Sequence, residues 1–249
     1  MSLLKRLFGR SAPAGFDAPL APDTPFYAIG DVHGCKAQMD QLLNLIAAEK
    51  NQGTIVFVGD YVDRGEQSAQ VLRALYERRD DPQLTCLVGN HEDMMLQFID
   101  APIRSGPRWL RNGGLQTLVS FGVSGVSAQP DEETLTRAGE DLKSAIGSGM
   151  LDWLRALPTR WQSGNIAVVH AGADPTEPMA LQTDEVLKWG HSDFATQPRS
   201  DNTWVLHGHT IVEAPTVRDG RIAIDTGAYA TGRLTAAYVS EEDVTFLST

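Results

Sequence analysis

The sequence has little cysteine, no long apolar run and a deficit of positive charge. Its two cysteines, Cys35 and Cys86, are too few for a disulfide framework and are not spaced as a CxxC metal pair, so we expect a reducing, cytoplasmic environment. No apolar stretch approaches the roughly 20 residues that cross a bilayer, which argues against an integral membrane protein. With 21 basic and 32 acidic residues the net charge is −11, which repels phosphate polymers and argues against nucleic acid as a partner.

The first 25 residues differ in composition from the rest of the chain. Residues 11–25 contain four prolines, and the apolar part of residues 1–10 is too short for a signal segment. We therefore expect residues 1–25 to form a flexible arm and residues 26–249 to form a single catalytic domain. A weak peripheral membrane anchor is the alternative interpretation of residues 1–10.

Apolar runs then alternate with stretches of helical periodicity. This alternation is typical of a layered α/β fold with helices on the faces of a sheet. The pattern predicts strands at residues 26–29, 54–58 and 84–88, and helices at residues 36–49 and 67–79.

The strand signal fades between residues 103 and 157, where glycines separate helical stretches such as residues 132–146. We expect a helical insertion there. Strands resume after it, and the last of them follow one another without helices, which predicts antiparallel pairing. The later strands are predicted at residues 165–169, 204–206, 221–224, 233–239 and 244–247.

Five of the predicted strands end in a polar cluster. Loops at the carboxyl ends of strands bind ligands in open α/β sheets, so we expect the Asp, Asn and His side chains of these clusters to meet at one sheet edge. Nitrogen and oxygen donors without a thiolate suit manganese, iron, zinc or magnesium. Five of the six histidines lie in the clusters, which are residues 30–34 (GDVHG), 59–65 (GDYVDRG), 89–92 (GNHE), 170–172 (HAG) and 207–210 (HGHT).

In their order and spacing these motifs resemble the metal-dependent phosphoprotein phosphatases of the calcineurin-like metallophosphoesterases, in particular short bacterial and phage serine/threonine phosphatases. The resemblance extends over residues 26–239 and includes residues 109–114 and 225–228. It implies a layered α/β metallophosphoesterase sandwich, with central β-sheets flanked by helices. It also implies two divalent metal ions, with manganese as the preferred metal. Both ions would activate a hydroxide for direct in-line attack on a phosphomonoester.

The resemblance assigns roles only to the positions that match. His91 would protonate the leaving alkoxide, and Asp63 would orient its ring. Arg64 would bind the phosphate with its planar guanidinium, together with Asn90. The implied metal ligands are Asp31 and His33 for the first ion, Asp60 for both ions, and Asn90, His170 and His209 for the second ion.

His191 departs from the family pattern. The family has a second phosphate-binding arginine in a Trp-x-Arg segment, which here ends in His191. A protonated imidazole could bind the phosphate in its place. The alternative is that His191 points away and that Arg218 or Arg233 takes the role.

Three functions follow as hypotheses. We favour a monomeric serine/threonine protein phosphatase acting on phosphorylated proteins or peptides, because Glu92 and the turn of residues 63–65 resemble those enzymes more closely. A dinucleoside polyphosphate hydrolase, of the diadenosine tetraphosphate type, is the alternative. A metal-binding scaffold without turnover is the third, and the complete ligand set argues against it.

Overall fold

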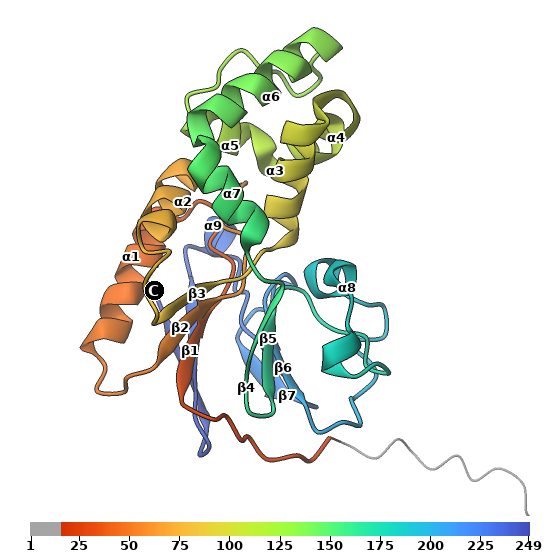
Figure 1. Cartoon of the computed structure of the whole chain (residues 1–249). Helices are drawn as coiled ribbons and strands as arrows, with labels where there is room; N and C mark the ends of the chain where they lie inside the picture. The colour runs from red at the N-terminus through yellow and green to blue at the C-terminus, as the bar shows by residue number, and fades with distance from the viewer. Residues whose placement is uncertain (1–15) are drawn as a thin grey trace, which may run out of the picture.

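Two five-stranded sheets face each other at the centre of the computed structural model, which describes residues 16–249 (Figure 1). The strand order is β10-β9-β1-β2-β3 in the first sheet and β4-β5-β6-β8-β7 in the second. The predicted layered α/β sandwich is therefore confirmed. The strands of the first sheet are β1 (Phe26–Ile29), β2 (Thr54–Phe57), β3 (Leu84–Cys86), β9 (Thr235–Val239) and β10 (Val244–Ser248), and those of the second are β4 (Arg160–Ser163), β5 (Ile166–Val169), β6 (Trp204–His207), β7 (Thr216–Arg218) and β8 (Arg221–Ala223).

Strand β1 is apolar throughout because both of its faces are buried. Successive side chains of a strand point to opposite faces of the sheet. Phe26 and Ala28 pack in the core between the two sheets, whereas Tyr27 and Ile29 pack in the core under the helices. Because both faces of the first sheet are covered, its central strands need apolar residues at every position.

Helices cover the first sheet and extend above both sheets. Helix α1 (Lys36–Ala48) buries Met39, Leu42 and Ile46, whose spacing places them on one face. Helices α1 and α2 (Ser68–Glu77) lie along the first sheet, and α8 (Asp184–Trp189) lies beside the second (Figure 1). The helical group above the sheets contains α3 (Asn90–Asp100), α4 (Pro102–Trp109), a π-helical turn (Leu110–Gly114), α5 (Leu115–Ser120), α6 (Glu132–Ile146) and α7 (Ser148–Ala156).

The structure corrects part of the predicted topology. Strand β8 pairs parallel with β6 in the second sheet, so antiparallel pairing of the last strands holds only for β7 with β8 and for β9 with β10 and β1. The polar clusters therefore come from two facing sheets and not from one sheet edge. Two strands, β4 and β7, were not predicted. A short helix, α9 (Ala228–Thr231), also separates β8 from β9.

The described part of the predicted N-terminal arm is extended and hydrogen-bonded. The Asn165 side chain accepts from the Ala21 amide (2.9 Å) and donates to the carbonyl oxygen of Pro19 (2.9 Å). Residues 1–15 of the predicted arm lie outside the described residues. Within residues 16–249, no helix combines the length and apolar character needed to cross a membrane.

Candidate metal centre

The first group of candidate ligands follows strands β1 and β2. His33 Nε2 lies 3.5 Å from the Oδ2 atom of Asp60. His33 donates a hydrogen bond from Nδ1 to the carbonyl oxygen of Val62 at 2.7 Å. The proton is therefore on Nδ1, and the lone pair of Nε2 faces Asp60 and could bind a metal ion. Burial lowers the pKa of His33 to about 3, so the ring is neutral and its lone pair is available to a cation.

The second group comes from α3 and from the second sheet. Asn90 is the first residue of α3, and its Oδ1 atom lies 2.8 Å from His170 Nε2 and 2.9 Å from His209 Nδ1. His170 Nε2 is also 3.4 Å from Asp60 Oδ1. The Nδ1 atom of His170 donates to the carbonyl oxygen of Val58 at 3.2 Å, so Nε2 is the ring atom that faces Asn90 and Asp60.

Asp60 links the two groups. Side-chain donor atoms lie within 4.8 Å of one another in His33, Asp60 and His91, and again in Asp60, His170 and His209. Such a shared carboxylate with imidazole and amide donors suits two neighbouring divalent cations. The residues present therefore fit the metal centre that the resemblance implies.

Asp31 adds negative charge to the same place. Its two carboxylate oxygens accept from the His209 amide, and the side chain is buried. Burial and the nearby Asp225 and Asp60 carboxylates raise the pKa of Asp31 well above its usual range. Among residues 16–249, no arginine or lysine forms an ion pair with Asp31, Asp60 or Asp225, so these buried carboxylates create a demand for cations.

The backbone of the site is strained. Among the described residues, seven other than glycine have a positive φ, and five of these belong to the predicted site. Non-glycine residues rarely adopt this region, and they keep it only where surrounding contacts impose it. The five are His33 (43°), Asp60 (54°), Asp63 (72°), Arg64 (67°) and His209 (62°).

The buried carboxylate of Glu92 imposes this backbone on the Asp60 loop. It accepts hydrogen bonds from the amides of Asp60 (2.8 Å), Tyr61 (2.7 Å) and Val62 (3.2 Å). It also accepts from the Gly89 amide at 3.0 Å. A side chain at Gly89 would collide with Asp60, because its Cβ would lie 2.1 Å from Asp60 Oδ1.

His91 and Asp63 form a buried pair beside the metal ligands. His91 Nδ1 lies 2.6 Å from Asp63 Oδ2. Asp63 also accepts from Trp109 Nε1 (3.0 Å) and Thr117 Oγ1 (2.8 Å). Burial opposes a charge on His91, but Asp60 and Asp63 raise its pKa above the usual value. Neither Trp109 nor Thr117 was predicted to support the site.

Arg64 extends over the cluster from the turn after Asp63. Its Nη1 donates to the Tyr229 hydroxyl at 2.8 Å, and its Nη2 lies 3.4 Å from His91 Nε2. The Arg64 amide donates to the carbonyl oxygen of Gly113 at 3.3 Å. Gly113 has φ 102°, and a Cβ there would lie 2.6 Å from the Arg64 nitrogen, so this approach requires glycine. The position of Tyr229 against Arg64 was also not predicted.

His191 lies apart from this arrangement. Its Nε2 is 3.7 Å from Asp174 Oδ2, and its Nδ1 accepts from the Asp193 amide at 3.2 Å. No hydrogen bond or ion pair within the described residues joins it to the metal ligands. The structure therefore brings together every other predicted site residue, and the phosphate-binding role of His191 stays a prediction.

Comparison with protein families gives one match that covers most of the chain. A model described as calcineurin-like phosphoesterase matches residues 24–213. This range includes the five clusters and the whole candidate ligand set.

Curated relatives are similar in sequence to this chain. A symmetrical bis(5'-nucleosyl)-tetraphosphatase from Chromobacterium violaceum is 32% identical over 168 residues, covering 67% of this chain and 50% of that protein. The asymmetrical bis(5'-nucleosyl)-tetraphosphatase PrpE from Oceanobacillus iheyensis is 26% identical, covering 86% of this chain and 88% of that protein. This chain therefore spans about half the length of the symmetrical relative.

A solved structure shares the fold. A candidate diadenosine tetraphosphatase superposes with a TM-score of 0.62 and 19% identity, covering 93% of this chain and 98% of that one. At this identity the similarity supports the arrangement of sheets and helices only.

Removal of divalent metal is expected to abolish phosphate-ester hydrolysis, because the ligands from both sheets converge on Asp60. Asp60→Asn removes the shared charge and should lower kcat by about 10²-fold or more. Steady-state rates with 4-nitrophenyl phosphate and metal content by elemental analysis measure both effects. Asp40→Asn, an exposed change on α1, is the control. Full turnover in excess chelator contradicts the prediction.

Glu92→Gln is expected to destabilise the protein by about 3 kcal/mol, because a neutral amide cannot replace a buried carboxylate that accepts from four backbone N–H groups. Urea unfolding measures the loss, and metal titration should show weaker binding. Asp93→Asn changes the adjacent acid, which pairs with Lys188, and should cost about 1 kcal/mol or less. Equal losses in the two variants would overturn the role given to Glu92.

Proposed function

Because this chain belongs to the calcineurin-like phosphoesterase family, we propose that its metal centre hydrolyses the polyphosphate chain of a dinucleoside tetraphosphate. The main structural support for this proposal is the arrangement of two groups of candidate metal ligands around Asp60, with Arg64 beside them. The substrate class is supported by the relatives, since similarity to bis(5'-nucleosyl)-tetraphosphatases extends over 67% and 86% of this chain. This favours the alternative hypothesis over the protein phosphatase.

In this proposal the ligands hold two divalent ions, of which manganese is the first to test. The holding residues are Asp31, His33, Asp60, Asn90, His170 and His209. Such ions supply Lewis acidity and activate water for attack on phosphorus.

The chain's own residues hold the phosphate and supply the proton. Arg64 has a planar set of donors that matches two phosphoryl oxygens. Tyr229 holds this guanidinium through a hydrogen bond to its hydroxyl and a contact with its ring. As water adds to phosphorus, the bond from phosphorus to the leaving phosphate oxygen breaks. His91 gives that oxygen a proton from Nε2, and Asp63 keeps Nδ1 protonated.

The His91–Asp63 pair also favours a second candidate, the serine/threonine protein phosphatase. An alkoxide is a poor leaving group and needs a proton more than a phosphate does. A buried acid whose pKa is raised by two carboxylates suits that chemistry.

Asp63→Asn is expected to move the pH profile of kcat. Asp63 raises the pKa of His91, so the variant has a lower His91 pKa. Because His91 acts in its protonated form, activity is lost as the pH rises through this pKa, and the descending limb should shift to lower pH. We also expect kcat to fall by about 10²-fold. Asp174→Asn, which changes the acid beside His191, should leave the limb in place. An unshifted limb in Asp63→Asn contradicts the assignment.

A substrate comparison tests the proposed function. Metal-loaded protein should hydrolyse diadenosine tetraphosphate with a kcat/KM at least about tenfold above that for a phosphoserine peptide, which corresponds to about 1.4 kcal/mol of transition-state binding. Chromatography of the products distinguishes symmetrical cleavage, which yields two ADP, from asymmetrical cleavage, which yields ATP and AMP. The opposite preference would favour the protein phosphatase.

His91→Asn makes this comparison more specific. The loss should be about 10²–10⁴-fold on the phosphoserine peptide and clearly smaller on the tetraphosphate, whose leaving oxygen is more acidic. Equal losses on both substrates would show that His91 acts other than as a proton donor.

A further inference from the structure

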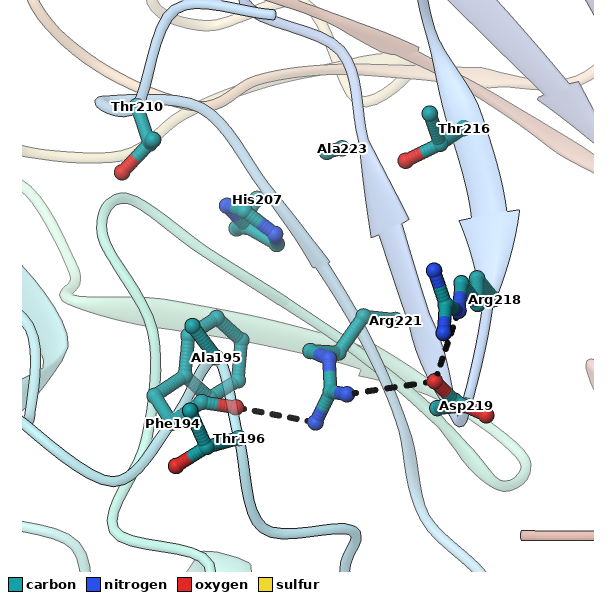
Figure 2. A pocket seen from close by; sticks show the side chains of 10 residues that line it. All are labelled: Phe194, Ala195, Thr196, His207, Thr210, Thr216, Arg218, Asp219, Arg221 and Ala223. Atoms are coloured by element: carbon teal, nitrogen blue, oxygen red, sulfur yellow. Dashed lines mark hydrogen bonds and ion pairs between the residues drawn. The ribbon is translucent and has the colours of Figure 1, made fainter. Parts of the chain in front are cut away.

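A pocket of about 460 Å³ lies on the outer face of the second sheet, away from the core between the sheets. Strands β6, β7 and β8 form one side of it, and the loop of residues 194–196 forms the other (Figure 2). This volume is in the range of sites that bind small molecules. Of the residues that line it, only Arg218 was considered above, as an alternative to His191 in binding the phosphate.

The walls combine an aromatic surface with hydroxyl groups. The rings of Phe194 and His207 pack edge to face with centroids 5.0 Å apart. Thr210 and Thr216 add hydroxyls to the lining. Phe194 is 7% and His207 6% exposed, so only the edges of these rings reach the pocket. Ring edges beside hydroxyl donors suit a nucleoside, which has a flat apolar base and a polar ribose.

Two arginines give the pocket a positive charge in a chain whose net charge is −11. Arg218 and Arg221 share one carboxylate oxygen of Asp219, at 2.9 Å and 3.7 Å (Figure 2). One positive charge is therefore left without a partner within the pocket. This excess suits a phosphate group.

The two arginines differ in freedom. Arg221 donates to the carbonyl oxygens of Phe194 (2.8 Å) and Gln197 (3.2 Å), so it is fixed as part of the wall. The Arg218 side chain is 83% exposed, and its Asp219 partner is half exposed. A weak surface ion pair of this kind leaves Arg218 free to turn toward a ligand.

The position of the pocket connects it with the candidate metal centre. Thr210 directly follows the ligand His209 and lies on the pocket wall. In Figure 2, Thr210 and Arg218 are on opposite sides of the view, with His207 between them. A substrate that occupied both the candidate metal centre and this pocket would therefore pass Thr210.

We propose that this pocket binds the second nucleotide of a dinucleoside polyphosphate, the one that is not attacked, with Arg218 on its phosphates and its nucleoside along the Phe194 wall. This inference rests on the proposed function, because only a substrate with two nucleotides fills both places. A short aryl phosphate such as 4-nitrophenyl phosphate has no second nucleotide to place in the pocket.

Two variants of the edge strand β7 test it. Arg218→Ala removes the charged donor, and Thr216→Trp fills the pocket. Val217→Trp is the matched control. Val217 lies between Thr216 and Arg218 in the strand, so its side chain points to the opposite face of β7 and does not line the pocket. With metal-loaded protein, the first two variants should lose about tenfold or more in kcat/KM for diadenosine tetraphosphate. All three variants should keep the wild-type kcat/KM for 4-nitrophenyl phosphate. Losses of equal size on both substrates, or no loss, overturn the inference.

A labelling experiment separates this inference from the proposed function. Metal-loaded wild-type protein is irradiated with 8-azido-ADP, and labelled peptides are located by mass spectrometry. We expect label within residues 194–197 or 216–223, which exclude the candidate ligand His209, lost in Thr216→Trp and kept in Val217→Trp. Failure to hydrolyse diadenosine tetraphosphate would overturn the proposed function, whereas label outside these two segments or undiminished label in Thr216→Trp would overturn the pocket assignment.

Discussion

The carboxylate of Glu92 is the contact on which the arrangement of the site depends. It accepts hydrogen bonds from four amides that have no strand partner, those of Gly89, Asp60, Tyr61 and Val62. Without an acceptor, each buried amide would cost free energy, and one of the contacts that hold Asp60 at a φ of 54° would be lost. Asp60 is the carboxylate that both donor groups share. One buried acid therefore sets the position of another.

Each of the two facing sheets positions part of the candidate ligand set. The first sheet places Asp31, His33 and Asp60 at the ends of β1 and β2, and the second places His170 and His209 at the ends of β5 and β6. The apolar core between the sheets holds these strand ends at a fixed separation. A cation bound between them would join the two sheets, so metal binding and folding stability are expected to be coupled.

Much of this could be predicted from the sequence, because each strand that carries candidate ligands is an apolar run followed within a few residues by Asp, Asn or His and a glycine. Strand β1 and helix α6 have the predicted bounds. Strand β4 (Arg160–Ser163) and strand β7 (Thr216–Arg218) escaped prediction because they are short, partly exposed and rich in polar residues. Their positions depend on pairing with β5 and β8, which is a tertiary contact.

The contacts of Asp63 were beyond prediction for a different reason. Trp109 and Thr117 are 46 and 54 residues away in the chain, and although the resemblance includes residues 109–114, nothing in the sequence shows that this stretch contacts Asp63. They show that the site has two supports, since the sheets carry the candidate metal ligands and residues 102–120 hold the turn of Asp63 and Arg64. The two supports can therefore diverge separately in evolution. A lineage that replaced the helical stretch would keep the same candidate metal ligands, while the contacts of Asp63, and through Asp63 the charge on His91, would change.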